Sequence, residues 1–357
     1  MLKKAFLIAV ISWSLTSIFV ISNTLNKKII YSGDESEEVV FLDQYFERAV
    51  RNTIGKQNGK IHREDIDSII HLDISHQEIS NLQGIEYFTS LEELICYDNY
   101  IVSIDLRYNT ALRTLQCQNN HLSNLNIDGL ERLECLVCSD NQIKKLEVNS
   151  NKALQTLICD NNQLTYLDLK NNPFLINLYC KDNHLIVLDL SFNNQLVDIN
   201  CSYNYLRKID LSFNTELREI RCGHNPITAL DISNNKKLEY IEFYDTNIST
   251  FTASGLAHLT ILRCGHNKLK TISLVDNDSL TDIYCDNNQI DVIDVGSNPQ
   301  LEILDCHNNH IVNLDLEGVR KLKELDCSKN DLSVLDLRYN TEIEYLLVDE
   351  ETDVLYP

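Results

Sequence analysis

The feature that most constrains this chain is a repeat of fixed length. From Leu91 to Glu342 the sequence divides into twelve consecutive units of 21 residues without an insertion. Each unit follows the pattern LxxLxCxxNxLxxLDLxxNxx, and residues 154–174 are one example. A period that is held over so many units indicates structural modules that stack on their neighbours, so the length of the chain says little about the number of domains.

Within one unit the apolar residues alternate and then turn back. Leu157 and Cys159 lie on one side of a short strand, and Ile158 between them faces the other side. The later leucines of the unit return the chain to the same interior. Because one coil cannot bury its own apolar side, the coils must stack. The pattern predicts a leucine-rich repeat solenoid of the α/β type, curved, with a parallel β-sheet on its concave face.

Two columns of asparagine accompany the apolar pattern. Asn occupies the ninth position of eleven units, from Asn99 to Asn330, and Thr246 is the exception. An inward amide at each turn can bond the free backbone groups of adjacent coils. A second column marks the return turn near the end of each unit. We expect a different turn shape in the three units that replace this second Asn by an apolar residue after glycine, at Gly129-Leu130, Gly255-Leu256 and Gly318-Val319.

The chain contains twelve cysteines, and their spacing argues against disulfides. Cβ vectors that point the same way oppose a bond between neighbours, even where the Cα distance would allow it. We therefore predict a ladder of free, buried thiols that act as small apolar groups. One thiol per coil does not converge on a metal ion. Cys135 is the one thiol that we expect to be exposed. Eleven cysteines hold the sixth position, where Phe243 fills the one vacancy: Cys96, Cys117, Cys138, Cys159, Cys180, Cys201, Cys222, Cys264, Cys285, Cys306 and Cys327.

The repeats have distinct segments at both ends. Helical spacing of apolar residues before Gly55 predicts a helical N-terminal cap over 41–70. Residues 71–90 form a first repeat of a 22-residue type, and 343–357 form a C-terminal cap strand that dissolves into an acidic tail. Lys3 and Lys4 precede an apolar stretch, so 1–22 is interpreted as a signal peptide or a signal anchor, followed by an acidic linker over 23–40.

The charge and the motifs limit the function. With 31 basic and 53 acidic residues the net charge is −22, which disfavours binding to nucleic acid. The sequence contains no G-x-S-x-G, H-E-x-x-H or P-loop motif. We expect no enzymatic activity, no cofactor and no catalytic or metal site, although an enzyme of unrecognised class is one alternative. His307 and His310 flank a turn, and we interpret them as structural.

A further alternative function rests on position fifteen of the repeat unit, which is acidic in nine units. The protein could then be a calcium-stabilised structural protein of the cell envelope. Carboxylates stacked in a column repel one another and attract Ca²⁺. The competing interpretation, which we favour, is that each carboxylate is solvated or caps its own turn. The acidic residues of this column are Asp105, Glu147, Asp168, Asp189, Asp210, Asp231, Asp294, Asp315 and Asp336.

The concave face carries one unusual stretch. Two units read Arg-Cys-Gly-His-Asn, at 221–225 and 263–267, and the unit between them carries Phe243 in place of the ladder cysteine. Glycine at position seven could open a shallow depression beside Arg and His. Arg and Tyr are common in binding hot spots. The alternative is that one segment was copied without selection for binding. We predict a basic, ligand-binding concave patch formed by Tyr179, Tyr203, Arg221, His224, Tyr240, Glu242, Tyr244, Arg263, His266 and Tyr284.

The N-terminal cap resembles that of a known family. The sequence IHREDIDSI at 61–69, the LDIS that follows it and LQGIEYFTSLEEL at 82–94 resemble the cap of listerial internalins. The strand cysteine of the 21-residue repeat is similar to that of internalins with a cysteine ladder. The likeness covers 41 to about 348, although we expect none of that family's usual further modules or wall-sorting signals.

The resemblance implies a curved solenoid that binds proteins or glycans outside the cell, sometimes in adhesion to a host. From it we expect an exported, non-enzymatic binding module that recognises an extracellular protein or glycan through its concave face. We expect this module to be monomeric, to be secreted or held at the cell envelope, and to contact a membrane only through an uncleaved N-terminal anchor.

Overall fold

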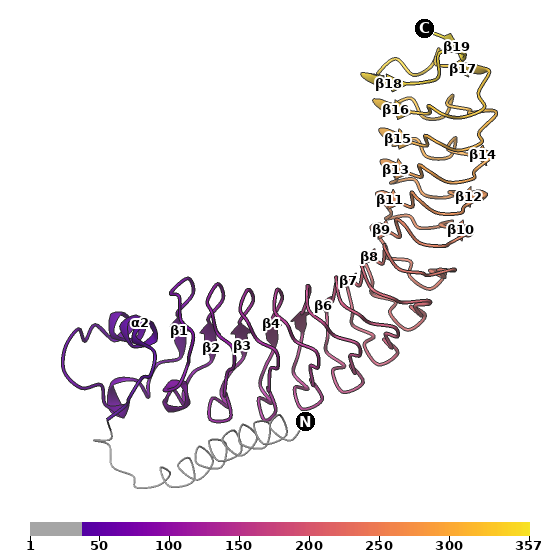
Figure 1. Ribbon diagram of the computed structural model, residues 1–357. Coiled ribbons are helices and arrows are strands. Elements are labelled where there is room, and N and C mark those ends of the chain that lie inside the picture. The colour runs from indigo at the N-terminus through magenta and orange to yellow at the C-terminus, as the bar shows by residue number, and fades with distance from the viewer. Residues whose placement is uncertain (1–37) are drawn as a thin grey trace, which may run out of the picture.

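The computed structural model describes residues 38–357, so the predicted signal segment and most of the acidic linker lie outside the described residues. The chain forms a curved solenoid whose concave side carries a parallel sheet (Figure 1). The predicted fold class is therefore confirmed. Within residues 38–357 no helix has both the length and the apolar character needed to span a bilayer.

The concave sheet has fourteen strands in chain order, each paired in parallel with the next. All fourteen are three residues long, and in most of them the middle residue is buried while its two neighbours are half-buried on the concave side. These strands are β1 (His71–Asp73), β2 (Glu93–Ile95), β3 (Thr114–Gln116), β4 (Cys135–Val137), β5 (Thr156–Ile158), β6 (Asn177–Tyr179), β7 (Asp198–Asn200), β8 (Glu219–Arg221), β9 (Tyr240–Glu242), β11 (Ile261–Arg263), β13 (Asp282–Tyr284), β15 (Ile303–Asp305), β16 (Glu324–Asp326) and β18 (Tyr345–Leu347).

Shorter sheets occupy the convex side of the C-terminal half. Figure 1 shows β10, β12 and β14 on the outer side of the solenoid, opposite β9, β11 and β13. They form a three-stranded parallel sheet, and a second convex pair closes the C-terminal end. The bounds of these strands are β10 (Thr250–Thr252), β12 (Thr271–Ser273), β14 (Val292–Ile293), β17 (Val334–Asp336) and β19 (Asp353–Leu355).

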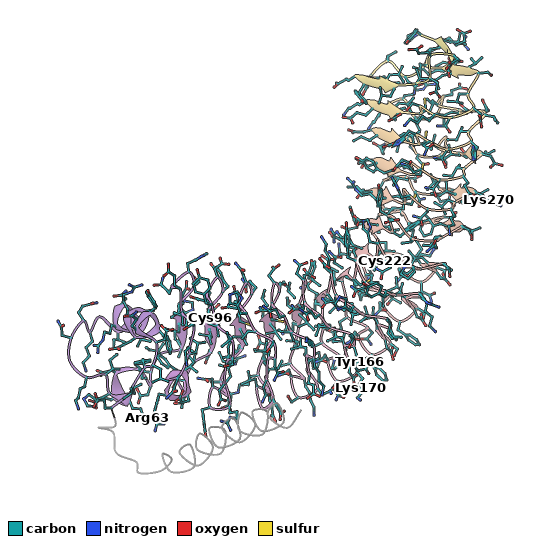
Figure 2. The ribbon with its side chains drawn as sticks, in the orientation of Figure 1. Arg63, Cys96, Tyr166, Lys170, Cys222 and Lys270 are labelled. Atoms are coloured by element: carbon teal, nitrogen blue, oxygen red, sulfur yellow. The ribbon has the colours of Figure 1, made fainter. Side chains whose placement is uncertain are left out.

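The cysteine ladder lies in the interior as predicted. All twelve thiols are free, eleven are buried, and Cys135 on β4 is partly exposed. Figure 2 labels Cys96 in the N-terminal arm and Cys222 at the bend, two members of the same column. Burial raises the pKa of Cys96 and of Cys201 to about 12, since a thiolate in the apolar interior is poorly solvated.

This burial leads to a first prediction. We expect a soluble aromatic disulfide reagent to label about one thiol of the native chain and all twelve after unfolding, because the reagent attacks thiolates that solvent can reach. Absorbance of the released product measures both numbers. A Cys135→Ser variant is the control, and its native form should be almost unreactive. Rapid labelling of several thiols in that variant would contradict a buried ladder.

The ninth-position asparagines bind the turns of adjacent coils together. The Nδ2 of Asn204 donates to the carbonyl oxygens of Cys180 at 2.9 Å and of Cys201 and Ser202 at 3.2 Å. Its Oδ1 accepts from the backbone N–H of Leu185 at 2.9 Å. The predicted role of the column is confirmed. At the exception, the hydroxyl of Thr246 contacts Oδ1 of Asn267 in the following unit and lies 3.3 Å from the carbonyl oxygen of Phe243.

Two of the three glycine-containing return turns differ in shape as expected, since Gly129 and Gly255 are left-handed, with φ of 81° and 72°. The backbone N–H groups of Leu130 and Val319 donate to the carbonyls three residues earlier, as the asparagines of the same column do. Leu256 is different, because its N–H donates to Oδ1 of Asn277 in the following unit at 2.9 Å. The prediction was wrong for the turn at Gly318, whose φ is not left-handed and which keeps the shared backbone bond, since this bond needs only an N–H.

The helix α2 (Gln44–Ile54) covers the N-terminal end, with the short 3₁₀ helices η1 (Arg63–Asp65) and η2 (Ile85–Tyr87) nearby. It ends at Gly55, whose φ of 68° is left-handed. Asp43 caps its first turn by accepting from Tyr45 and Phe46, and its other oxygen accepts from Ser80 in the first repeat. One carboxylate thus joins the cap to the solenoid.

The C-terminal segment corrects an expectation. Instead of dissolving after β18, the chain turns back and adds β19 to the convex side, where it pairs with β17. Asp349 makes this possible, since its carboxylate accepts from the backbone N–H groups of Lys329 and Asn330 at 2.8 and 3.1 Å. The acidic residues therefore complete a last coil that shields the array.

Candidate functional site

The ten predicted residues lie on consecutive coils of the concave face. Five of them share one column with Asn200, because the parallel register aligns the last residue of each strand from β6 to β13. Tyr240 occupies the first position of β9. We call this set the strand row, and its members are Tyr179, Arg221, Tyr240, Glu242, Arg263 and Tyr284. The other four follow their strands and form the edge row, which consists of Tyr203, His224, Tyr244 and His266. The two rows together are the concave patch.

Cation–π contacts organise the strand row. The guanidinium carbon of Arg221 lies 4.5 Å from the ring centroid of Tyr240. The guanidinium carbon of Arg263 lies 4.2 Å from the ring centroid of Tyr284, one strand further along. The hydroxyl of Tyr240 donates to Glu242 at 2.8 Å, and burial together with this bond raises the tyrosine pKa to about 12. Each of these planar side chains is thus held in place by a neighbouring side chain.

The structure corrects the expectation of a basic patch at one of its two arginines. The guanidinium of Arg221 pairs with Glu219 at 2.6 Å and with Asp198 at 3.2 Å, two carboxylates that sequence reasoning had missed. The hydroxyl of Tyr179 donates to the same Asp198. Burial is the main cause that raises the pKa of Asp198. The charge of Arg221 is thus neutralised within the protein. Arg263 forms no ion pair within residues 38–357 and contacts the Tyr284 ring instead.

The edge row is a continuous line of rings. The centroids of Tyr203 and His224 are 3.9 Å apart and their planes are tilted by 21°, which is a stacked arrangement. The line continues from His224 to Tyr244 at 5.7 Å and from Tyr244 to His266 at 4.7 Å. Lys181, which sequence reasoning also missed, holds its ammonium nitrogen 5.1 Å from the Tyr203 ring centroid. Four coils therefore present one aromatic strip.

Tyr203 adopts a backbone conformation that its side chain disfavours. The eighth residue of every unit is left-handed, with φ between 51° and 56°. Asn, Asp and His, which tolerate this region comparatively well, fill ten of these twelve positions, and Tyr203 and Lys329 are the exceptions. Tyr203 is also 46% exposed. Tyr203 therefore combines a disfavoured backbone conformation with an exposed ring that stacks on His224.

The two glycines of the patch do not open a depression, contrary to the expectation. Gly223 and Gly265 are both buried. A Cβ atom on Gly223 would lie 2.7 Å from the carbonyl oxygen of Tyr244 in the next coil. A Cβ atom on Gly265 would collide with the carboxylate of Asp286. Glycine is needed here because the next coil fills the space, and this close approach brings Tyr244 into the edge row.

The acidic column at position fifteen lies apart from the patch, on the return side of each coil. The carboxylate of Asp189 accepts from the backbone N–H of Ser191 at 3.0 Å, and this bond is the main cause that lowers the aspartate pKa. The same bond, to the N–H two residues on, recurs at Asp105, Asp168, Asp210, Asp231, Asp294, Asp315 and Asp336. The geometry favours turn capping over a calcium column.

Comparison with solved structures places the chain among known proteins. It is similar to the functional domain of InlJ from Listeria monocytogenes, which includes a cysteine ladder, with 31% identity and a TM-score of 0.85. The match covers 88% of this chain and 70% of that one. The chain belongs to the internalin family. The alignment spans most of both chains, and a cysteine ladder, which in this internalin consists of free, buried thiols, is a feature that the two proteins share.

Two other structures share the fold with this internalin. An internalin, InlF, of Listeria monocytogenes matches 88% of this chain and 95% of its own at 20% identity and a TM-score of 0.68. The effector YopM from Yersinia pestis matches 96% of this chain and 99% of its own at 21% identity and a TM-score of 0.66. No family model matches the sequence, and a search of curated proteins found no match.

Proposed function

We propose that this internalin is an exported, non-enzymatic binding module that recognises a protein or a glycan through the concave patch. The observation that carries the proposal is Tyr203, which is exposed and strained and begins a strip of four rings. Aromatic faces flanked by fixed hydrogen-bonding groups suit the apolar faces and hydroxyls of a sugar, or the side chains of a protein hot spot.

Three further points support this proposal. The array presents a wide concave surface, the usual binding face of repeat solenoids. The sequence carries no motif of the common hydrolases or nucleotide-binding enzymes. Basic residues followed by an apolar stretch in 1–22 fit an export signal, which supports secretion or a place at the cell envelope. We propose that the module acts as a monomer.

The experiment uses the full chain, a glycan array and pull-downs from candidate surface extracts to find a ligand. Tyr203→Asn is the diagnostic variant. We expect it to weaken binding about 5- to 30-fold, since hot-spot side chains contribute on the order of 1–2 kcal/mol. We also expect it to raise the free energy of unfolding by about 1 kcal/mol, because Asn tolerates the left-handed conformation better than Tyr.

Lys329→Asn is the matched control. It relieves the same backbone conformation outside the patch, so it should stabilise the fold without changing affinity. Arg221, Tyr244 and Arg263 are half-buried, and alanine at each should cost on the order of 1–2 kcal/mol of binding. Full-strength binding by the variant that combines these three changes would place the site elsewhere, on the convex turns or the N-terminal cap.

A further inference from the structure

A cluster of three metal-ligating side chains lies next to the concave patch. Asp305 ends β15, Asp326 ends β16, and the register pairs the two residues directly. The Nδ1 of His307 lies 2.7 Å from Oδ1 of Asp305 and 3.7 Å from Oδ2 of Asp326. One ligand atom from each residue falls within 4.8 Å of the others. Among residues 38–357 no other group of three His, Cys, Asp or Glu side chains meets this condition.

The two carboxylates lack a permanent positive partner. Like charges that face each other on neighbouring strands destabilise a sheet. At Asp198 the guanidinium of Arg221 neutralises the carboxylate. By contrast, the only ion pairs that the described residues form with Asp305 and Asp326 are those with His307. Burial raises the pKa of Asp305, and the nearby carboxylate of Asp286 adds to the shift. A bound cation would remove this repulsion.

The surrounding residues hold the three ligands in position. Ser328 donates its backbone N–H and its hydroxyl to Oδ1 of Asp326, at 3.1 and 2.7 Å, which leaves Oδ2 on the side of His307. The far nitrogen of the imidazole, Nε2, lies 3.3 Å from the side-chain amide of Asn287. Ser328 is an outer partner of the kind that orients carboxylate ligands at metal sites, and the Asn287 amide contacts the ring. The donor set is therefore built into two strands and one turn rather than assembled from mobile side chains.

We propose that Asp305, His307 and Asp326 form a binding site for a divalent transition metal ion, with zinc the best match. A donor set of one imidazole and two carboxylates suits zinc, whereas calcium and magnesium prefer oxygen alone. All three side chains are half-buried, so a metal held here keeps at least one position open to solvent. Tyr284 of the concave patch pairs with Asp305, so the site borders that patch.

The test is a zinc titration of the full chain in competition with a chromophoric chelator. We expect one zinc-binding site in the unchanged chain. Its affinity for zinc should fall at least tenfold in His307→Ala and in Asp326→Asn. His310→Ala is the matched control, because this imidazole lies three residues away and pairs instead with the exposed Asp331. It should bind as the unchanged chain does. Circular dichroism of each variant establishes that the solenoid is intact.

Cobalt substitution supplies a second readout, which separates this site from the thiols. Nitrogen and oxygen ligands give weak visible bands, whereas thiolates add intense charge-transfer absorption in the near ultraviolet. We expect the weak bands alone, and their disappearance in His307→Ala. Equal zinc affinity in that variant, or a thiolate spectrum, would overturn the assignment. Neither outcome bears on ligand recognition by the concave patch, which is tested without metal.

Discussion

Replacing Asn204 by alanine is expected to lower the free energy of unfolding by about 2–4 kcal/mol. The side chain is buried and makes four hydrogen bonds to the backbone of two adjacent coils. Alanine would leave the N–H of Leu185 and up to three carbonyls without this partner, away from water. Urea denaturation followed by circular dichroism measures the loss.

Two further variants separate hydrogen bonding from volume. Asn204→Asp keeps the size and the acceptor but loses the donors, so we expect a loss at least as large as that of alanine. Asn194→Ala is the control, since this asparagine is exposed on the return side of the preceding coil, and its effect should stay below about 0.5 kcal/mol. If Asn204→Ala behaved like Asn194→Ala, the column would not be what holds the turns together.

The second large effect is expected at Phe243. This residue replaces the ladder cysteine of its coil, is fully buried, and packs against Phe251 with ring centroids 4.5 Å apart. The same coil carries Ala253 where most other units place a leucine or isoleucine, so two large side chains are balanced by one small one. Phe243→Ala should cost about 3–5 kcal/mol, and Phe243→Cys about 2–4 kcal/mol, although the latter restores the repeat pattern.

A double-mutant cycle tests this balance of volumes. Ala253→Leu alone should overpack the coil and destabilise it by about 1–3 kcal/mol. Combined with Phe243→Cys it should cost less than the sum of the single changes, because the added methyl groups enter space that the ring has left. Phe213→Ala, at a phenylalanine that is 56% exposed, is the control for ring removal. Simple additivity would show that the two positions do not share that space.

The sequence predicts this fold well because each position of the repeat unit has the same structural role in every coil. Position within the unit determines which residues face the interior, and the columns of Cys201 and Asn204 could be predicted from spacing alone. The C-terminal coil could not, because its pattern fades after Val348. There a carboxylate, that of Asp349, takes over the bonding of the backbone turn. Where the repeat pattern ends, the spacing of residues no longer predicts which of them face the interior.

The candidate site was predictable only in outline. Spacing placed Arg221 and Tyr240 on the same face, but it did not reveal that Asp198 and Glu219 neutralise the arginine, since this depends on how side chains reach across coils. The strain at Tyr203 was hidden for another reason. The left-handed backbone of position eight is imposed by stacking, so only the structure shows that a tyrosine is unusual there.

The columns make the length of this protein adjustable in fixed steps. Excision of residues 154–174 would join Ala153 to Leu175 and set Cys180 directly after Cys138, with every interior column still in register. The concave face would shorten by one strand spacing, about 4.8 Å, while each remaining coil kept neighbours of the same kind. Loss of a number of residues that is not a multiple of 21 would shift all later columns at once. Recombination between similar units can therefore change the length of the concave surface while the packing of the interior stays the same.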